Sequence, residues 1–454
     1  MKPLLSALTL VSMAAAPLLA PPAGATEARL NAMGGGVKLW TVEDEVNIFD
    51  FPSLLVRYGN RTYVDNLSAG DGFPNGRFGF HYNLGDDTVI ALFGGHITSA
   101  SRAPTAFSGQ AGSAFDTSFV PTGNLITGGQ SLGVGYEASQ APESAGGSLG
   151  AIGAVEFRYG LMFATAIGAS TRLGLMLNVA ADNDDVEQPT GSMVDRGGLL
   201  LDLGVGLGLD FSGSELELSA GLGFGFADDR RDGVNAATGQ TIELLEHEGT
   251  SQFGFRLGAR WIFDFFNQSK IVTYTQFLYG SQTVENLNAA PGSPVPLGAY
   301  TGLAFTLGAD LRIEPFEDVL VSPGLGVRFA QQTLEGTTQV NRDADLLMSL
   351  PFYGVAVDLR VASWLDVRFG ASQSVDLLRD SDTNVLGLGL TSQRDYATVN
   401  THFAFGLGLN LPVGESAMSF DLDLNPEWLL NGPEFLTGNA TSSFGLSGAL
   451  KYAW

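Results

Sequence analysis

Three stretches of the sequence repeat the triplet Asp-apolar-Arg, and a fourth stretch carries two acids at the same spacing. In a β-strand the first and third residues of a triplet lie on one face, so each acid and its arginine point the same way. Opposite charges on neighbouring strands then pair, as in a selectivity ring, a set of anchors for a plug, or a structural network that fills an interior. The residues concerned are Asp310, Arg312, Asp358, Arg360, Asp366, Arg368, Asp421 and Asp423.

Other patterns with chemical potential lack the context that their chemistry needs. Residues 129 to 133 match the nucleophile elbow of hydrolases, but no alternation of strands and helices surrounds them. The four histidines have no metal-ligand spacing, and the acidic run at 182 to 185 lacks the glycine and later glutamate of a calcium loop. We therefore predict no enzyme, no catalytic residue, no metal site and no cofactor.

The elements that would position these charges are strands with two different faces. From 199 to 209 leucine and valine alternate with glycine and aspartate, and from 215 to 226 the alternation repeats. Residues 443 to 454 follow the same period and end on Trp454. A soluble sandwich would cover each apolar face with a second sheet, whereas a barrel in lipid turns that face outward and the small or polar face inward. The pattern predicts an all-β, transmembrane, antiparallel up-and-down barrel.

The rhythm of turns and loops predicts sixteen strands. Tight turns near Gly85, Gly168, Gly213, Asn267, Glu314, Ala362 and Pro412 alternate with eight longer polar loops, which places both termini on the periplasmic side. Fourteen strands remain an alternative, because the 98 to 148 segment and the first strand pair are weakly patterned. Aromatic residues near several of these turns, among them Trp261, Phe265, Trp364 and Trp454, predict a periplasmic aromatic girdle.

Two prolines interrupt predicted strands. Pro323, followed by Gly324, falls in the strand near 318 to 331, and Pro351 falls in the next strand. Proline removes a donor from the ladder, so each position predicts a bulge or kink. Such a kink either opens a lateral gap in the wall or only adjusts its curvature.

Bulk properties place this barrel in an envelope. Residues 1 to 25 carry Lys2, an apolar stretch and a small-residue cleavage signal at Ala25, which is typical of a secretory signal peptide. The chain has no cysteine and a net charge of -25, so a Gram-negative outer membrane fits and nucleic acid is excluded as a partner. The expected surroundings are the lipid bilayer with its lipopolysaccharide, and the expected partner is the outer-membrane assembly machinery, acting on the C-terminal strand.

The N-terminal part of the chain resembles a known family. The stretch from Ala28 to Val37, the acids from Glu43 to Glu45 and the segment from Asn47 to Leu54 are similar to the N-terminus of FadL-type outer-membrane transporters of long-chain fatty acids and aromatic hydrocarbons. Members of that family typically have an Asn-Pro-Ala hatch segment inside the barrel. Here Phe51-Pro52-Ser53 stands at those positions, so only the proline is shared.

The resemblance implies a domain division and an activity. Residues 26 to 52 would form a plug inside a barrel that comprises residues 53 to 454. The plug residues implied are Asp44, Asn47, Asp50 and Pro52. The implied activity is passive uptake of a small-molecule solute, hydrophobic in character, with exit sideways through a gap in the wall.

Three functions are compatible with the sequence. The first is a plugged barrel that passes small hydrophobic molecules without an energy source of its own. The second is an open porin whose acidic lumen prefers cations, because a polar, glycine-rich interior suits it equally well. The third is a barrel that does not transport but displays its long loops or anchors a partner.

Overall fold

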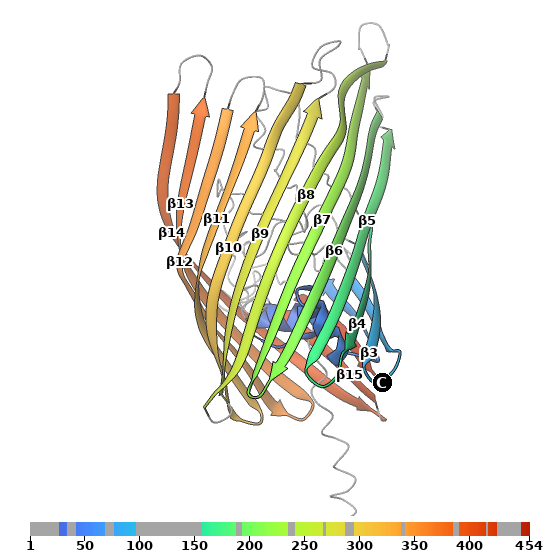
Figure 1. The fold of residues 1–454 in the computed structure, drawn as a ribbon, viewed down its shortest axis with the longest axis vertical. Coiled ribbons are helices and arrows are strands. Elements are labelled where there is room, and N and C mark those ends of the chain that lie inside the picture. The colour runs from blue at the N-terminus through green and yellow to red at the C-terminus, as the bar shows by residue number, and fades with distance from the viewer. Residues whose placement is uncertain are drawn as a thin grey trace, which may run out of the picture.

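The chain forms one closed, antiparallel barrel of sixteen strands (Figure 1). The computed structural model describes residues 27–33, 42–68, 77–96, 157–187, 193–234, 241–266, 269–286, 295–336, 341–384, 390–414, 416–424 and 446–454. The predicted signal peptide at 1 to 25 and the elbow-like motif at 129 to 133 lie outside these residues. No helix within the described ranges is both long and apolar enough to cross a membrane.

Among the residues that the structure describes, three short helices precede the strands: α2 (Glu27–Ala32), η3 (Glu45–Phe49) and η4 (Pro52–Arg57). The strands are β1 (Arg61–Ser68), β2 (Arg77–Asn83), β3 (Thr88–His96), β4 (Phe157–Ala166), β5 (Thr171–Glu187), β6 (Met193–Phe211), β7 (Ser214–Val234), β8 (Thr241–Phe266), β9 (Ser269–Asn286), β10 (Val295–Phe316), β11 (Val319–Gly336), β12 (Asn341–Ala362), β13 (Leu365–Asn384), β14 (Leu390–Val413), β15 (Ser416–Leu424) and β16 (Leu446–Ala453). Each strand pairs with its neighbours in sequence, and β1 pairs with β16. The predicted fold class and strand number are confirmed, and the fourteen-strand alternative is wrong.

The two faces of the strands have the predicted orientation over most of the wall. In β6 the side chain of Val205 is 50% exposed on the outer surface, whereas Asp202 is 0% exposed and points inward. Leu199 and Leu203 are exposed beside Val205. An apolar outer face of this kind is the face that a bilayer solvates.

Short turns join the strands at the end of the barrel where the chain terminates (Figure 1). Gly168, Gly213 and Gly414 adopt positive φ in three of them, a conformation that glycine accepts without strain. The turn predicted near Glu314 and Pro315 is displaced. There β10 runs on to Phe316 and the turn falls at residues 317 and 318, because the ladder absorbs Pro315 in an irregularity between Ile313 and Phe316. A proline at a bulge removes no ladder hydrogen bond, so the strand continues past it.

Exposed aromatic side chains lie near these turns, as predicted. Trp261, Phe265, Trp364 and Trp454 are all exposed. Trp454 also stacks on Phe80 of β2, with ring centroids 5.6 Å apart. Tryptophan favours the headgroup level of a bilayer, since its ring is apolar and its N–H hydrogen-bonds. These residues form an aromatic band at one end of the barrel.

The wall is paired on the β12 side of Pro323 but interrupted at Pro351. Pro323 points outward and lies opposite Val355 of β12, within a continuous stretch of ladder. The irregularity lies at Leu350 and Pro351, which are both exposed and unpaired with either neighbouring strand. Because this bulge adds one residue, the inward-facing positions of β12 change parity across it. The lateral gap stays a prediction.

One sector of the wall differs from the sequence expectation of a small or polar inner face. Val89 and Phe93 of β3, Met162 of β4 and Met176 of β5 point inward and are buried, although the outward side chains of the same strands are apolar too. Strands that are covered by apolar groups on both faces lose their alternation. The N-terminal segment covers the inner face of β3 to β5, and their outer face is the apolar surface that a bilayer would cover.

Candidate functional site: the N-terminal segment in the barrel lumen

The N-terminal segment lies inside the barrel, toward the end that carries the short turns (Figure 1). Its first helix, α2, contacts β13 to β16 and β1, whereas η4 contacts β3 to β6 on another side of the wall. The first strand begins only at Arg61, so η4 belongs to this inner segment and not to the wall. The boundary predicted at residue 53 therefore falls within η4. We refer to residues 27–33 and 42–60 as the inner segment.

Wall glycines receive the backbone of the inner segment. A Cβ added to Gly174 of β5 would lie 2.2 Å from the carbonyl carbon of Pro52 and 2.3 Å from the backbone nitrogen of Ser53. At Gly206 of β6, which pairs with Gly174, it would lie 2.8 Å from the same nitrogen. At Gly406 of β14 an added Cβ would lie 2.3 Å from the Cβ of Ala32 in α2, so this glycine receives a side chain of the segment. Part of the glycine-rich inner face is thus shaped for the segment, because no larger residue leaves room for a backbone at this distance.

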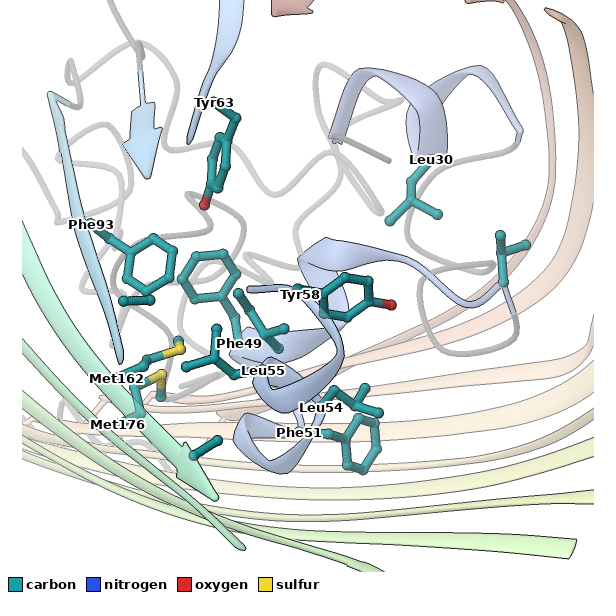
Figure 2. Packing of buried hydrophobic residues seen from close by; sticks show 14 of the residues in the cluster. Leu30, Phe49, Phe51, Leu54, Leu55, Tyr58, Tyr63, Phe93, Met162 and Met176 are labelled. Carbon is teal, nitrogen blue, oxygen red and sulfur yellow. The ribbon is translucent and has the colours of Figure 1, made fainter. Parts of the chain in front are cut away.

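Apolar side chains fill the space between the inner segment and β3 to β5 (Figure 2). Ile48, Phe51, Leu54 and Leu55 are completely buried there. The Phe49 ring meets Phe93 of β3 edge to face, with centroids 4.9 Å apart. Since each fully buried side chain of this size contributes about 1.5–3 kcal/mol, apolar burial is the main attraction between segment and wall.

Acidic residues tie the inner segment to several strands. Asp50 accepts a hydrogen bond from Arg256 of β8 at 2.7 Å, and Arg256 also donates to the carbonyl of Phe49 at 3.2 Å. Glu43 pairs with Arg57 in η4 at 2.6 Å and with Arg312 of β10 at 3.4 Å. These contacts fix the segment at separate points around the wall.

Asp44, Asn47 and Arg29 form a link between the two parts of the inner segment. The side chain of Asn47 accepts a hydrogen bond from the backbone N–H of Asp44 at 2.7 Å, which caps η3. Arg29 of α2 pairs with Asp44 at 3.4 Å and with Asp358 of β12 at 2.9 Å. Together with Pro52 on the wall glycines, all four plug residues predicted from the resemblance lie in the lumen.

The predicted charge ring is divided in the structure. One cluster of opposite charges joins β12, β13 and β15, with Arg368 at its centre: Arg368 lies 2.5 Å from Asp421, 3.3 Å from Asp366 and 3.4 Å from Asp358. Arg360 joins the same cluster through Asp366 at 3.5 Å.

The other three predicted charges lie apart from that cluster. Arg312 pairs with Glu314 and Glu43, and Asp310 lies next to Ser322 of β11 with 3.4 Å between their side-chain oxygens. Gly324 leaves the room that the Asp310 carboxylate occupies, because a Cβ there would come within 1.7 Å of it. Asp423 pairs along the ladder with Gly406, beside α2. What any of these charges does stays a prediction.

A second charged network, under η4, was missed by the sequence analysis. Arg172 of β5 pairs with Glu215 and Glu217 of β7, each at 2.7 Å. Arg57 reaches Glu215 at 2.6 Å, and the hydroxyl of Ser53 donates to Glu217 at 2.7 Å. Hydrogen bonds and ion pairs of this network thus bind the polar side of η4, and the apolar cluster packs against its other side.

Burial and neighbouring charges set the protonation of the inner segment. Burial alone would lower the pKa of Arg29, but the carboxylates of Asp358 and Asp44 raise it above its usual value. Burial raises the pKa of Glu43, and the charges of Arg57 and Arg312 outweigh this and leave the pKa below its ordinary 4.5. Burial also raises the pKa of Tyr58. Glu43 is therefore ionised at neutral pH and Tyr58 is not.

The wall residues that hold the segment carried a sequence signal that was not used. Arg256 and Arg260 share the inward parity of Gly254 and Gly258, so a charge among lumen glycines marked them as interior. Their partners were not evident, because a single sequence does not give the distance between an N-terminal acid and a strand 200 residues away. Arg260, for example, lies over the ring of Phe51 at 5.1 Å.

Comparison with known proteins gives a likeness of architecture only. No family model and no curated protein matches the sequence. Among solved structures, the toluene transporter TodX of Pseudomonas putida is 9% identical over 95% of this chain and 98% of its own, with a TM-score of 0.38. The toluene transporter TbuX of Ralstonia pickettii is 10% identical over the same shares, with a TM-score of 0.35. The ferric-catecholate import receptor Fiu of E. coli is 9% identical over 87% and 81%, with a TM-score of 0.34.

Proposed function

We propose that the chain is an outer-membrane barrel that lets small hydrophobic molecules pass by diffusion, and that the inner segment is its plug. The main support is the seat of η4: the backbone at Pro52 and Ser53 rests directly on Gly174 and Gly206, and the residues around it are completely buried. A segment fitted this closely blocks water-filled passage at its level. An open cation-preferring porin would need the lumen clear at that depth.

The lining of the lumen favours an apolar solute. Phe93, Met162 and Met176 face the plug from β3 to β5, so a shift of η4 would uncover an apolar surface on that side. The opposite side, around Arg368, is charged and internally paired. A small hydrophobic molecule can follow the first surface without leaving a buried charge unpaired, whereas a hydrated cation gains nothing from it.

Removal of the plug tests this function. In planar bilayers the full chain should give few openings, and a variant that lacks residues 27–57 should give large, steady conductance steps. Liposomes carrying the full chain should exclude small sugars yet admit a radiolabelled alkylbenzene faster than protein-free liposomes do. Glu317→Gln, in the exposed turn between β10 and β11, serves as the control and should behave like the unmodified chain.

Two results would count against the proposal. If deletion of residues 27–57 leaves the conductance unchanged, the segment is not a plug. If the full chain already gives large cation-selective steps and swells liposomes in sugar, the porin alternative is correct.

A further inference from the structure

Within the described residues, the two ladders that β1 makes where the barrel closes are the shortest of the wall, with six residue pairs to β16 and five to β2. The ladder between β1 and β16 runs from Arg61 opposite Ala453 to Ser68 opposite Ser447, with an irregularity in β1 between Val64 and Leu67. By comparison, β13 and β14 pair from Leu365 to Asn384 without interruption. Since each cross-strand pair adds to sheet stability, few backbone hydrogen bonds hold β1 against β16 and β2.

A single carboxylate of the inner segment contacts all three strands at this seam. Glu45, at the start of η3, lies 3.1 Å from Lys451 of β16, 3.3 Å from Arg61 of β1 and 3.4 Å from His81 of β2. These three residues face inward on consecutive strands around the closing junction. Arg61 and His81 are partners in the ladder between β1 and β2, and Lys451 joins them only once the first and last strands have paired.

The seam residues are buried deeply enough for this carboxylate to matter. Lys451 and His81 are 0% exposed and Glu45 is 2% exposed. Nδ1 of His81 lies 2.7 Å from the carbonyl oxygen of Tyr58, and the Arg61 guanidinium lies over the Tyr58 ring at 5.1 Å. Without Glu45, a buried ammonium and a guanidinium would lie on adjacent strands with no acid between them, and like charges in that arrangement push strands apart.

We propose that Glu45 is a lock on the seam: the inner segment, through this carboxylate, holds β1, β2 and β16 together, so that the position of the segment and the closure of the wall are coupled. The inference rests on the closed barrel and on these contacts, and it holds whether or not the barrel transports a solute. On the outer surface the stacked pair Phe80 and Trp454 spans the same junction. The barrel therefore still closes when Glu45 is changed, but its seam opens more often.

Hydrogen exchange on the purified full chain in detergent tests the lock. In Glu45→Gln, amides of residues 61–68 and 446–453 should exchange about 10- to 100-fold faster than in the unmodified chain, because a buried ion pair has lost one partner. Amides of residues 365–376, in the long ladder, should not change. Asp50→Asn is the matched control: it removes an even shorter pair between segment and wall, 2.7 Å to Arg256 of β8, and should leave seam exchange unchanged.

A charge-balanced variant separates the lock from general damage. In Glu45→Gln combined with Lys451→Gln, the acid and the closest cation are both gone, so seam exchange should return toward that of the unmodified chain. The same reasoning applies if Glu45→Gln yields no folded barrel, because recovery of folding in the double variant would support the lock and failure to recover would overturn it. Unchanged seam exchange in Glu45→Gln, or an equal rise in Asp50→Asn, would also overturn it.

Discussion

Replacement of Gly174 by alanine should loosen the inner segment from the wall. The added Cβ would lie 2.2 Å and 2.3 Å from backbone atoms of Pro52 and Ser53, well inside an ordinary contact of 3.4 Å or more. The wall cannot yield, because Gly174 is held in the ladder opposite Gly206. The helix η4 must therefore move away by about 1 Å, which stretches the hydrogen bond from Ser53 to Glu217.

The size of the effect follows from the cost of overpacking. Insertion of a methyl group against a rigid neighbour costs about 1–3 kcal/mol, and a cost borne only by the seated plug shifts its equilibrium roughly 5- to 150-fold toward release. In planar bilayers Gly174→Ala should therefore open far more often than the unmodified chain. Gly448→Ala is the control, since its added Cβ would have no neighbour closer than 3.4 Å.

The same substitution in the variant that lacks residues 27–57 shows whether the added methyl group clashes with η4 or disturbs the strand itself. If the clash is with η4, Gly174→Ala should lower the melting temperature of the full chain and leave that of the variant lacking residues 27–57 unchanged, because nothing remains for the methyl group to meet. An equal loss of stability in both backgrounds would mean that the glycine serves the strand itself. In that case Gly174 would not serve to seat the inner segment.

Two further predictions test the surroundings of the barrel and the charge of its plug. Leu175, 56% exposed on the outer face, should tolerate Ala but lose about 2–4 kcal/mol of stability in lipid when changed to Arg, measured by urea titration in vesicles. Burial raises the pKa of Glu45, and Lys451 and Arg61 outweigh this and keep it below 4.5. Its contribution is present above pH 4.5 and is lost as the pH falls through the lower, folded-state pKa, so acid should reduce the melting temperature of Glu45→Gln less than that of the unmodified chain.

The strands and turns of the wall could be predicted from the sequence because each depends on residues close together in the chain. Residues 201 to 211 and 215 to 226 alternate strictly, and the structure turns Val205 outward and Asp202 inward as that period requires. Turn chemistry located most junctions within a residue or two. The exception near Pro315 arose because proline was taken as a turn signal, whereas at a strand end a bulge accommodates it equally well.

The contacts of the inner segment could be predicted only in part, because they depend on the register of distant strands. The acids from Glu43 to Glu45 were evident, and so was a polar inner face. That Glu45 would meet Lys451 depends on the closure of β1 against β16, and no local pattern encodes it. The triplets that begin at Asp358 and Asp366 lie together in the structure because β12 and β13 are neighbouring strands. Asp310 lies on β10, which is not next to either of them, so it does not join their cluster.

The balance of forces on the inner segment suits a plug that can move. Its ion pairs, such as Asp50 with Arg256, give a unique position more than net stability, because the desolvation of two buried charges offsets most of their attraction. If the segment shifts and water enters, each partner is solvated again and the loss is small. What resists movement is the apolar cluster around Phe51 and Leu54, and an apolar solute can replace those contacts. A solute of that kind would therefore favour its own passage, whereas a hydrophilic one would have to displace the cluster without compensation.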